Sequence, residues 1–197
     1  MRYDAEHKAR TRERVLKEAA AAIRADGPER VGVADVMGRA GLTHGGFYAH
    51  FKSKDDLITQ AIGYMFDERY ARFLDRVTTT DPQAALSQFV DWYLSIDHCR
   101  APETGCPLPG LVASLPRLPG AAQERFVLGA RRLTEGLATL LDRSKCEDAG
   151  RLAQSAIAEL IGALSLARAT PDCDQAARVL DASRISIKQR LGVGGSD

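Results

Sequence analysis

Three side chains that can donate hydrogen bonds to phosphate oxygens lie close together in the first third of the chain. Tyr48 offers a hydroxyl, His50 an imidazole and Lys54 an ammonium group. Thr43 comes a few residues earlier, where it can cap a helix whose N-terminal amides then face an anion. Each of these groups can bind an anion such as a phosphate, although His50 taken in isolation is more often a solvated helix residue.

A helix-turn-helix is the element predicted to position these side chains. Its first short helix is expected over residues 33–40 and its second over residues 43–51. Gly41 lies between them and tolerates the positive φ that the turn requires. The small Ala40 lets the two helices approach each other, and Leu42 fills the gap between them.

Hydrophobic periodicity is helical along almost the whole chain, and no strand alternation is convincing. An all-α fold is therefore predicted, with an N-terminal three-helix head and a larger helical body. We expect helices at about 10–25, 54–77, 82–98, 121–142, 146–169 and 172–191, and a short irregular helix near 108–115.

Composition narrows the class of protein. The chain has 197 residues, of which 45% are hydrophobic and 27% charged, values that are ordinary for a globular protein and exclude a disordered chain, collagen or a rod. Residues 1–54 carry 11 basic and 7 acidic side chains, and the rest carries 16 and 19, so the positive charge lies at the N-terminal end. Without a membrane span or an apolar signal segment, we expect a cytoplasmic protein whose four cysteines are reduced.

Residues 46–57, with the sequence GFYAHFKSKDDL, resemble the TetR family of transcriptional repressors. The resemblance is strong over about residues 8–62. It implies a homodimer of all-helical subunits, each with a helix-turn-helix DNA-binding domain at residues 1–54. A ligand-binding and dimerisation domain at 55–191 and a tail at 192–197 would follow.

The same resemblance implies which residues contact operator DNA. Phe47 and Phe51, four residues apart, would anchor the second helix in the core of the head. Arg10, Arg12, Arg14 and Lys17 form either a solvated helix face or a set that includes one or two phosphate contacts. The DNA-binding residues carried over from the family are Thr43, His44, Gly45, Gly46, Tyr48, His50 and Lys54.

Two glycines depart from the family pattern. Gly45 and Gly46 stand where family members often have side chains, and each weakens a helix by about 1 kcal/mol relative to alanine. They also remove two side chains that would read base edges. DNA shape and close backbone approach are then expected to carry more of the discrimination.

Residues that would bind an effector are harder to find from sequence. Bulky aromatic residues at helical spacing belong to a core more often than to a pocket, yet a ligand-responsive body needs an apolar cavity. Trp92 and Tyr93 are the preferred lining residues because their polar tips need partners when buried. Charged side chains are scarce in these helices, which favours an apolar or aromatic effector. The full candidate set is Tyr64, Phe89, Trp92, Tyr93, Cys106 and Phe126.

Cys106 and the last two helices leave alternatives open. The Cys106 thiol precedes a short predicted helix and is either a reactive sensor of electrophiles or a small packing residue. The helices at 146–169 and 172–191 either form the homodimer interface, which we favour, or close the core of one subunit. No metal or other cofactor is predicted, since His98, Cys99 and Cys106 lack a fourth ligand.

The sequence thus predicts a dimeric repressor that binds a palindromic operator in double-stranded DNA and is released by a small effector. The effector would displace the long helix that begins near Lys54 and so change the separation of the two heads. One alternative is a redox- or electrophile-sensing repressor that uses Cys106. A second is an all-helical enzyme, but we find no HExxH motif, no phosphate-binding loop and no paired carboxylates, so no enzymatic activity is predicted.

Overall fold

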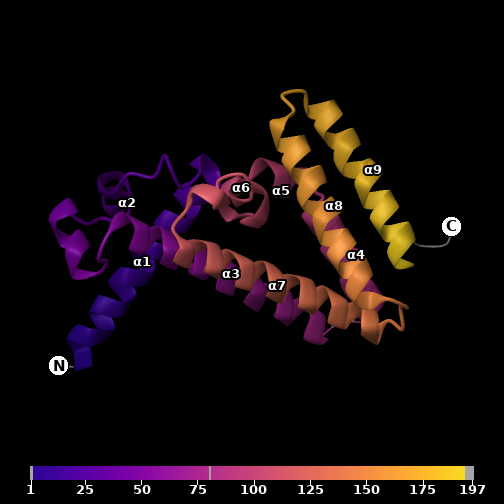
Figure 1. The fold of residues 1–197 in the computed structure, drawn as a ribbon, viewed down its shortest axis with the longest axis horizontal. Helices are drawn as coiled ribbons and strands as arrows, with labels where there is room; N and C mark the ends of the chain where they lie inside the picture. The colour runs from indigo at the N-terminus through magenta and orange to yellow at the C-terminus, as the bar shows by residue number, and fades with distance from the viewer. Residues whose placement is uncertain (1, 80, 194–197) are drawn as a thin grey trace. The chain divides into compact units, whose positions relative to one another are not determined.

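The computed structural model describes residues 2–79 and 81–193. Every regular element in that part of the chain is a helix, which confirms the predicted all-α fold (Figure 1). Within the same residues, no helix combines the length and the apolar character that crossing a membrane requires.

The chain forms two compact units. The first unit contains residues 1–67 and 102–129, and the second contains residues 68–101 and 130–197. Two long helices, α3 and α7, therefore contribute to both units. These two units are defined by how the chain packs. The functional boundary at residue 54, between a DNA-binding and a ligand-binding domain, remains a prediction.

The first unit is built on α1 (Arg2–Asp26) and continues through the predicted helix-turn-helix. The apolar face expected for α1 is buried, with Val15, Ala19 and Ile23 fully inaccessible. The other elements of this unit are α2 (Val33–Arg39), η1 (His44–Ala49), the start of α3 (Lys54–Thr79), η2 (Pro102–Thr104), α6 (Leu108–Leu111), η3 (Leu115–Arg117) and the start of α7 (Gly120–Arg143).

The second helix of the helix-turn-helix, η1, differs from the prediction. It is a 3-10 helix that ends at Ala49 instead of reaching Phe51, and its N-cap residue Thr43 makes no side-chain capping bond. Gly45 and Gly46 occupy its middle, where they weaken an α-helix because glycine loses the most backbone freedom on folding. The tighter 3-10 geometry is common in short elements of this kind.

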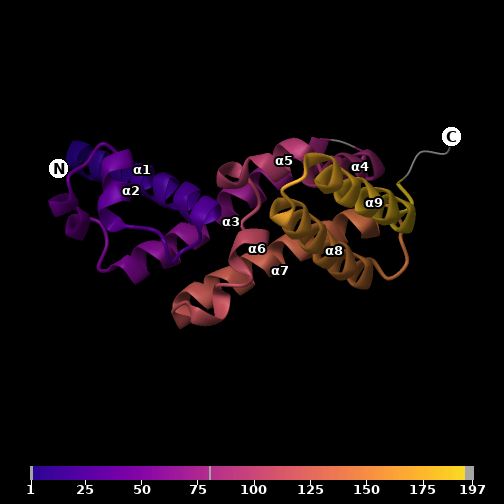
Figure 2. The ribbon, with the colours of Figure 1, turned by 90° about the horizontal axis from the view of Figure 1, so that it is seen from above.

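The second unit contains a pair of neighbouring C-terminal helices, α8 (Ala149–Ala169) and α9 (Cys173–Leu191). They pack against each other and against α4 (Pro82–Tyr93) (Figures 1 and 2). The helix predicted over 82–98 is interrupted, because Ser95 caps a separate helix, α5 (Ile96–Arg100), by accepting a hydrogen bond from the His98 amide at 3.1 Å.

The ends of these helices follow the expected chemistry with one exception. Asp81 accepts a hydrogen bond from the Ala84 amide (3.0 Å) and Asp172 accepts one from the Gln175 amide (2.7 Å), so both carboxylates cap the helices that follow them. The exception is α8, which begins at Ala149 rather than at residue 146, because Asp148 at its N-cap has a left-handed backbone. The predicted tail falls mainly on residues 194–197, which lie outside the described residues.

Candidate DNA-binding interface

Two stacked phenylalanines hold η1 against the rest of the first unit. Phe47 and Phe51 are each 2% exposed, and their ring centroids are 5.6 Å apart. Met37 and Val36 of α2 are fully buried, and α2 packs against η1. The predicted anchoring role of the two phenylalanines is therefore confirmed. It leaves the other side of η1 free for function.

The turn between α2 and η1 depends on Gly41. Its φ is +68°, a left-handed conformation that strains any residue with a Cβ atom. The amide of Leu42 returns to the carbonyl oxygen of Met37 at 2.9 Å, and this bond closes the end of α2. The positive φ predicted from the position of Gly41 is confirmed.

The opposite side of η1 is open to solvent. Thr43, His44 and Gly45 are exposed, and Tyr48 is 73% exposed although it is adjacent in sequence to the buried Phe47. A Cβ atom at Gly45 would meet nothing within 4 Å, so no contact inside the chain demands glycine there. Two side chains with hydroxyl groups and one imidazole thus project from a firmly anchored element.

His50 has a different environment from Tyr48. Its side chain is half-buried, and desolvation, then the nearby positive charges of Lys8 and Arg12, lower the pKa of its imidazole. The buried Nδ1 atom has no hydrogen-bond partner among the described residues. A phosphate oxygen beside this ring would supply both an acceptor and a compensating negative charge.

The basic residues around His50 are only partly those singled out from sequence. Arg12 lies over the Phe51 ring, 5.0 Å from its centroid, and donates a hydrogen bond to Gln60. Lys8, which the sequence reasoning did not consider, also acts on His50. The signal that would have found it is the spacing of Lys8 and Arg12, four residues apart on one helix face.

Lys54 is half-buried at the start of α3. Its Nζ donates a hydrogen bond to the carbonyl oxygen of Glu29 at 3.4 Å, so the ammonium already has a contact within the first unit. That contact is long and weak, and the group remains partly accessible to an anion.

The residues predicted to bind an effector are divided between the two units. Tyr64, Cys106 and Phe126 belong to the first unit, where Phe126 packs edge-on against Phe66 with the centroids 5.7 Å apart. The second unit contains the remaining three, Phe89, Trp92 and Tyr93.

In the second unit these three rings form an aromatic cluster with His98. The Phe89 centroid lies 6.3 Å from that of Trp92 and 5.8 Å from that of Tyr93. The His98 ring stacks on Trp92 at 4.4 Å, and its Nδ1 atom hydrogen-bonds to the Tyr93 carbonyl oxygen at 2.7 Å. Arg69 covers Trp92, with its guanidinium carbon 5.0 Å from the ring centroid.

His98 is the residue of this cluster that the sequence reasoning missed, having weighed it only as a metal ligand. Burial lowers the pKa of its imidazole to about 4; the hydrogen bond to the Tyr93 carbonyl oxygen opposes this shift, and smaller effects of Arg168 and Arg69 add to it. The ring is therefore neutral at physiological pH. Stacking on Trp92 gives it a structural role in the second unit.

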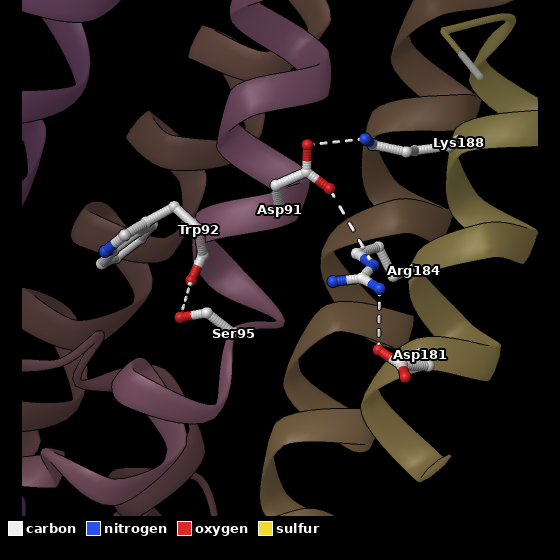
Figure 3. Close-up of polar contacts among 6 residues, drawn as sticks. All are labelled: Asp91, Trp92, Ser95, Asp181, Arg184 and Lys188. Atoms are coloured by element: carbon white, nitrogen blue, oxygen red, sulfur yellow. Dashed lines mark hydrogen bonds and ion pairs between the residues drawn. The ribbon is translucent and has the colours of Figure 1, made fainter. Parts of the chain in front are cut away.

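A charged group beside the cluster ties α4 to α9. Asp91 accepts a hydrogen bond from Lys188 at 2.6 Å and lies 3.9 Å from Arg184, which also pairs with Asp181 (Figure 3). Ser95 donates to the Trp92 carbonyl oxygen at 2.8 Å, where α4 ends (Figure 3).

The geometry does not favour Cys106 as a sensor. Its side chain is only 3% exposed, and the helix after it, α6, spans four residues. Reactive cysteines need access to their oxidant or electrophile. Across the side chains that the structure describes, no group of three or more His, Cys, Asp or Glu residues is placed to hold a metal ion.

The predicted dimer helices bury more of their surface within one chain than expected. On α8, both Leu160 and Leu164 are fully buried. The large apolar side chains that are exposed on these helices are Leu166 of α8, at 63%, and Ile185 of α9, at 55%. The small residue Gly162, one turn before Leu166, is exposed as well.

Comparison with known proteins agrees with this geometry. Residues 15–61 match the profile of the bacterial regulatory proteins of the tetR family. A TetR transcriptional regulator from Chloroflexus aurantiacus is 26% identical, with a TM-score of 0.80 over 95% of this chain and 96% of that one. Residues 15–61 thus carry a TetR-family DNA-binding region. Together with the fold, this match supports a DNA-binding transcriptional regulator.

Other TetR-fold structures are similar at lower identity. A TetR regulator from Legionella pneumophila is 24% identical, with a TM-score of 0.79 over 90% of this chain and 95% of that chain. NemR from Escherichia coli, in its reduced form, is 17% identical, with a TM-score of 0.80 over 91% and 95%. No curated protein matches the sequence. These likenesses support the TetR fold.

Proposed function

We propose that this chain is a TetR-type ligand-responsive repressor that binds a palindromic operator as a homodimer. The observation that carries the proposal is the two-sided η1, with Phe47 and Phe51 buried and Thr43, His44 and Tyr48 turned to solvent. An element anchored on one face and polar on the other can enter a major groove without disturbing its own core.

The proposed contacts fall into two classes. Thr43 and His44, at the start of η1, approach base edges, and Gly45 and Gly46 let the backbone come close to the groove. The phosphate contacts come from Tyr48, His50 and Lys54. This division makes the phosphate contacts responsible for most of the affinity and for its salt dependence.

Dimerisation through α8 and α9 would give the two-fold symmetry that binding to a palindromic operator requires. Two recognition elements must lie in successive major grooves, about 34–36 Å apart for a site spaced by one helical turn. The exposed Leu166 and Ile185, with Gly162 nearby, offer an apolar surface with room for close helix crossing.

The effector belongs to the same proposal. It is a small apolar or aromatic molecule, and its candidate contacts within the second unit are Phe89, Trp92 and Tyr93. It releases the operator by binding more tightly to a state in which α3 is displaced. The chain acts in the cytoplasm, where it reaches DNA, and regulates without catalysing a reaction.

Selection of genomic fragments by the purified chain tests this function. Fragments that contain a shared inverted repeat are expected, and sedimentation of the complex should give two chains or a multiple of two per duplex. Recovery of no fragment above background would overturn the proposal. Turnover of a substrate without protection of any duplex would favour the enzyme alternative.

Substitutions then test the phosphate contacts on the recovered duplex. Tyr48→Ala and Lys54→Ala should weaken binding on all sequences, and Lys54→Ala should lower the slope of log affinity against log salt by about one. The matched control is Lys52→Ala, which removes the same charge two residues before Lys54 from an exposed side chain. Equal slopes for Lys52→Ala and Lys54→Ala would remove Lys54 from the set.

A further inference from the structure

The turn between α1 and α2 is held by a part of the chain that is distant in sequence. Arg117 donates two hydrogen bonds to Glu29 Oε1, from Nη2 at 3.0 Å and from Nε at 3.2 Å. Ser114 donates to Glu29 Oε2 at 3.2 Å. Both carboxylate oxygens of this turn residue are therefore occupied by side chains that follow α6. We call Glu29, Ser114 and Arg117 the Glu29 clamp.

A second contact supports the same junction from the α1 side. Arg24, which is 7% exposed, donates to the carbonyl oxygens of Glu103 (3.2 Å) and Met65 (3.4 Å). A Cβ atom on Gly110 would lie 3.4 Å from the Arg24 carbonyl oxygen, so α6 runs close to the end of α1. The segment 102–117 thus packs along the end of α1 and the turn that follows it, within the first unit.

Glu29 also connects this segment to the DNA-binding residues. Its main-chain carbonyl oxygen accepts the hydrogen bond from Lys54, a proposed phosphate contact. Val31, two residues further on, is buried, and Gly32 is the N-cap of α2. The position of Glu29 therefore bears on both the start of α2 and the ammonium group of Lys54.

We infer that Glu29 and Arg117 are positioning residues for DNA binding, through which the segment 102–117 orders the α1–α2 turn and presents α2, η1 and Lys54 to the duplex. The inference rests on the proposed operator binding. It adds, within the first unit, a second attachment of the head besides α3. A carboxylate that accepts three hydrogen bonds orders its turn more than a single exposed ion pair would.

A double-mutant cycle tests the clamp in the full-length dimer. The variants are Arg117→Ala, Glu29→Ala, both together, and the charge-reversed pair Glu29→Arg with Arg117→Glu. The control is Arg131→Ala, because Arg131 is exposed to the same 66% as Arg117 and pairs with Glu135 on its own helix. The measurements are amide hydrogen exchange of residues 29–33 without DNA, and affinity for the duplex recovered by selection.

Each single variant should speed exchange in residues 29–33 and weaken duplex binding about twofold to fivefold, and the double variant should be no worse than either single one. The charge-reversed pair should recover most of the loss, and Arg131→Ala should change neither readout. Unchanged exchange in both single variants would overturn the inference. Opposite effects on affinity, weaker for Arg117→Ala and stronger for Glu29→Ala, would also overturn it, because net charge alone explains that pattern. If the parent binds no duplex, the proposed function fails and the exchange cycle alone decides the clamp.

Discussion

The DNA-binding head and the aromatic cluster of the second unit use aromatic residues in opposite ways. In the head, the buried Phe47 and the 73% exposed Tyr48 are adjacent, so packing and contact with a partner fall on separate side chains. In the cluster, Tyr93 is a candidate effector contact and is itself 2% exposed core. Packing and binding are therefore separable by mutation in the head, whereas in the cluster they are combined in the same rings.

The largest effect is expected from a substitution on the buried side of η1. Phe47→Ala should lower the free energy of unfolding by about 3–5 kcal/mol, because it removes a buried ring and leaves a cavity beside Phe51. Tyr48→Ala should change stability by less than about 0.5 kcal/mol, since surface substitutions rarely do more, and still weaken DNA binding. Chemical denaturation of both variants, followed by circular dichroism, measures the difference.

A large loss of stability for Tyr48→Ala would contradict the separation of roles. So would a stable Phe47→Ala variant. Tyr48→Phe serves as the matched control, because it keeps the ring and removes only the hydroxyl proposed to contact phosphate. It should retain parental stability and lose part of the affinity for the duplex.

In the cluster, the expected effect appears on changing pH. Burial holds the pKa of His98 at about 4, against about 6.5 in the unfolded chain. The unfolded state therefore takes up a proton first as the pH falls. Stability that is fully present above pH 6.5 should be lost between about pH 6.5 and 4, by a total of about 3 kcal/mol. Denaturation at several pH values, followed by the fluorescence of Trp92, the chain's only tryptophan, measures this loss.

The control for His98 is a variant that cannot titrate. His98→Gln should unfold more easily at neutral pH, because the ring stacked on Trp92 is gone, but the part of the pH dependence due to His98 should disappear. If the parent and the variant lose stability in parallel between pH 6.5 and 4, carboxylates account for the loss and His98 does not.

The head was predictable from sequence because its signals are local. Gly41 and the Phe47–Phe51 spacing each depend on neighbours within a few residues, and the structure confirms both. The family pattern around Tyr48 added the expected function. Even there, the 3-10 form of η1 was missed, although the paired glycines that explain it were noticed.

The contacts that were not predictable join residues of different elements. His98 was overlooked because the ring stacked on it, Trp92, is contributed by another helix, and periodicity reports only which face of a helix is apolar. The Glu29–Arg117 contact spans 88 residues, and neither residue belongs to a motif. Which apolar residues of α8 are buried within the chain also depends on tertiary packing, which sequence alone does not supply.

The smallest effect is expected in the head, at His50, whose pKa can be compared with that of His98. Desolvation, Lys8 and Arg12 lower the pKa of His50, but a DNA phosphate beside the accessible part of the ring would raise it in the complex. Protonation of His50 would then be linked to DNA binding. Affinity for the duplex should therefore increase as the pH falls through the range just below 6.5, and this increase should be reversed as the pH rises. One unit of pKa increase corresponds to at most about a tenfold change in affinity.

Fluorescence anisotropy at constant ionic strength should detect this change in affinity in a His44→Gln background, which removes the other histidine near η1. Adding His50→Gln should flatten the dependence, whereas an unchanged profile would place the His50 ring away from phosphate and leave it, like His98, a residue of packing alone.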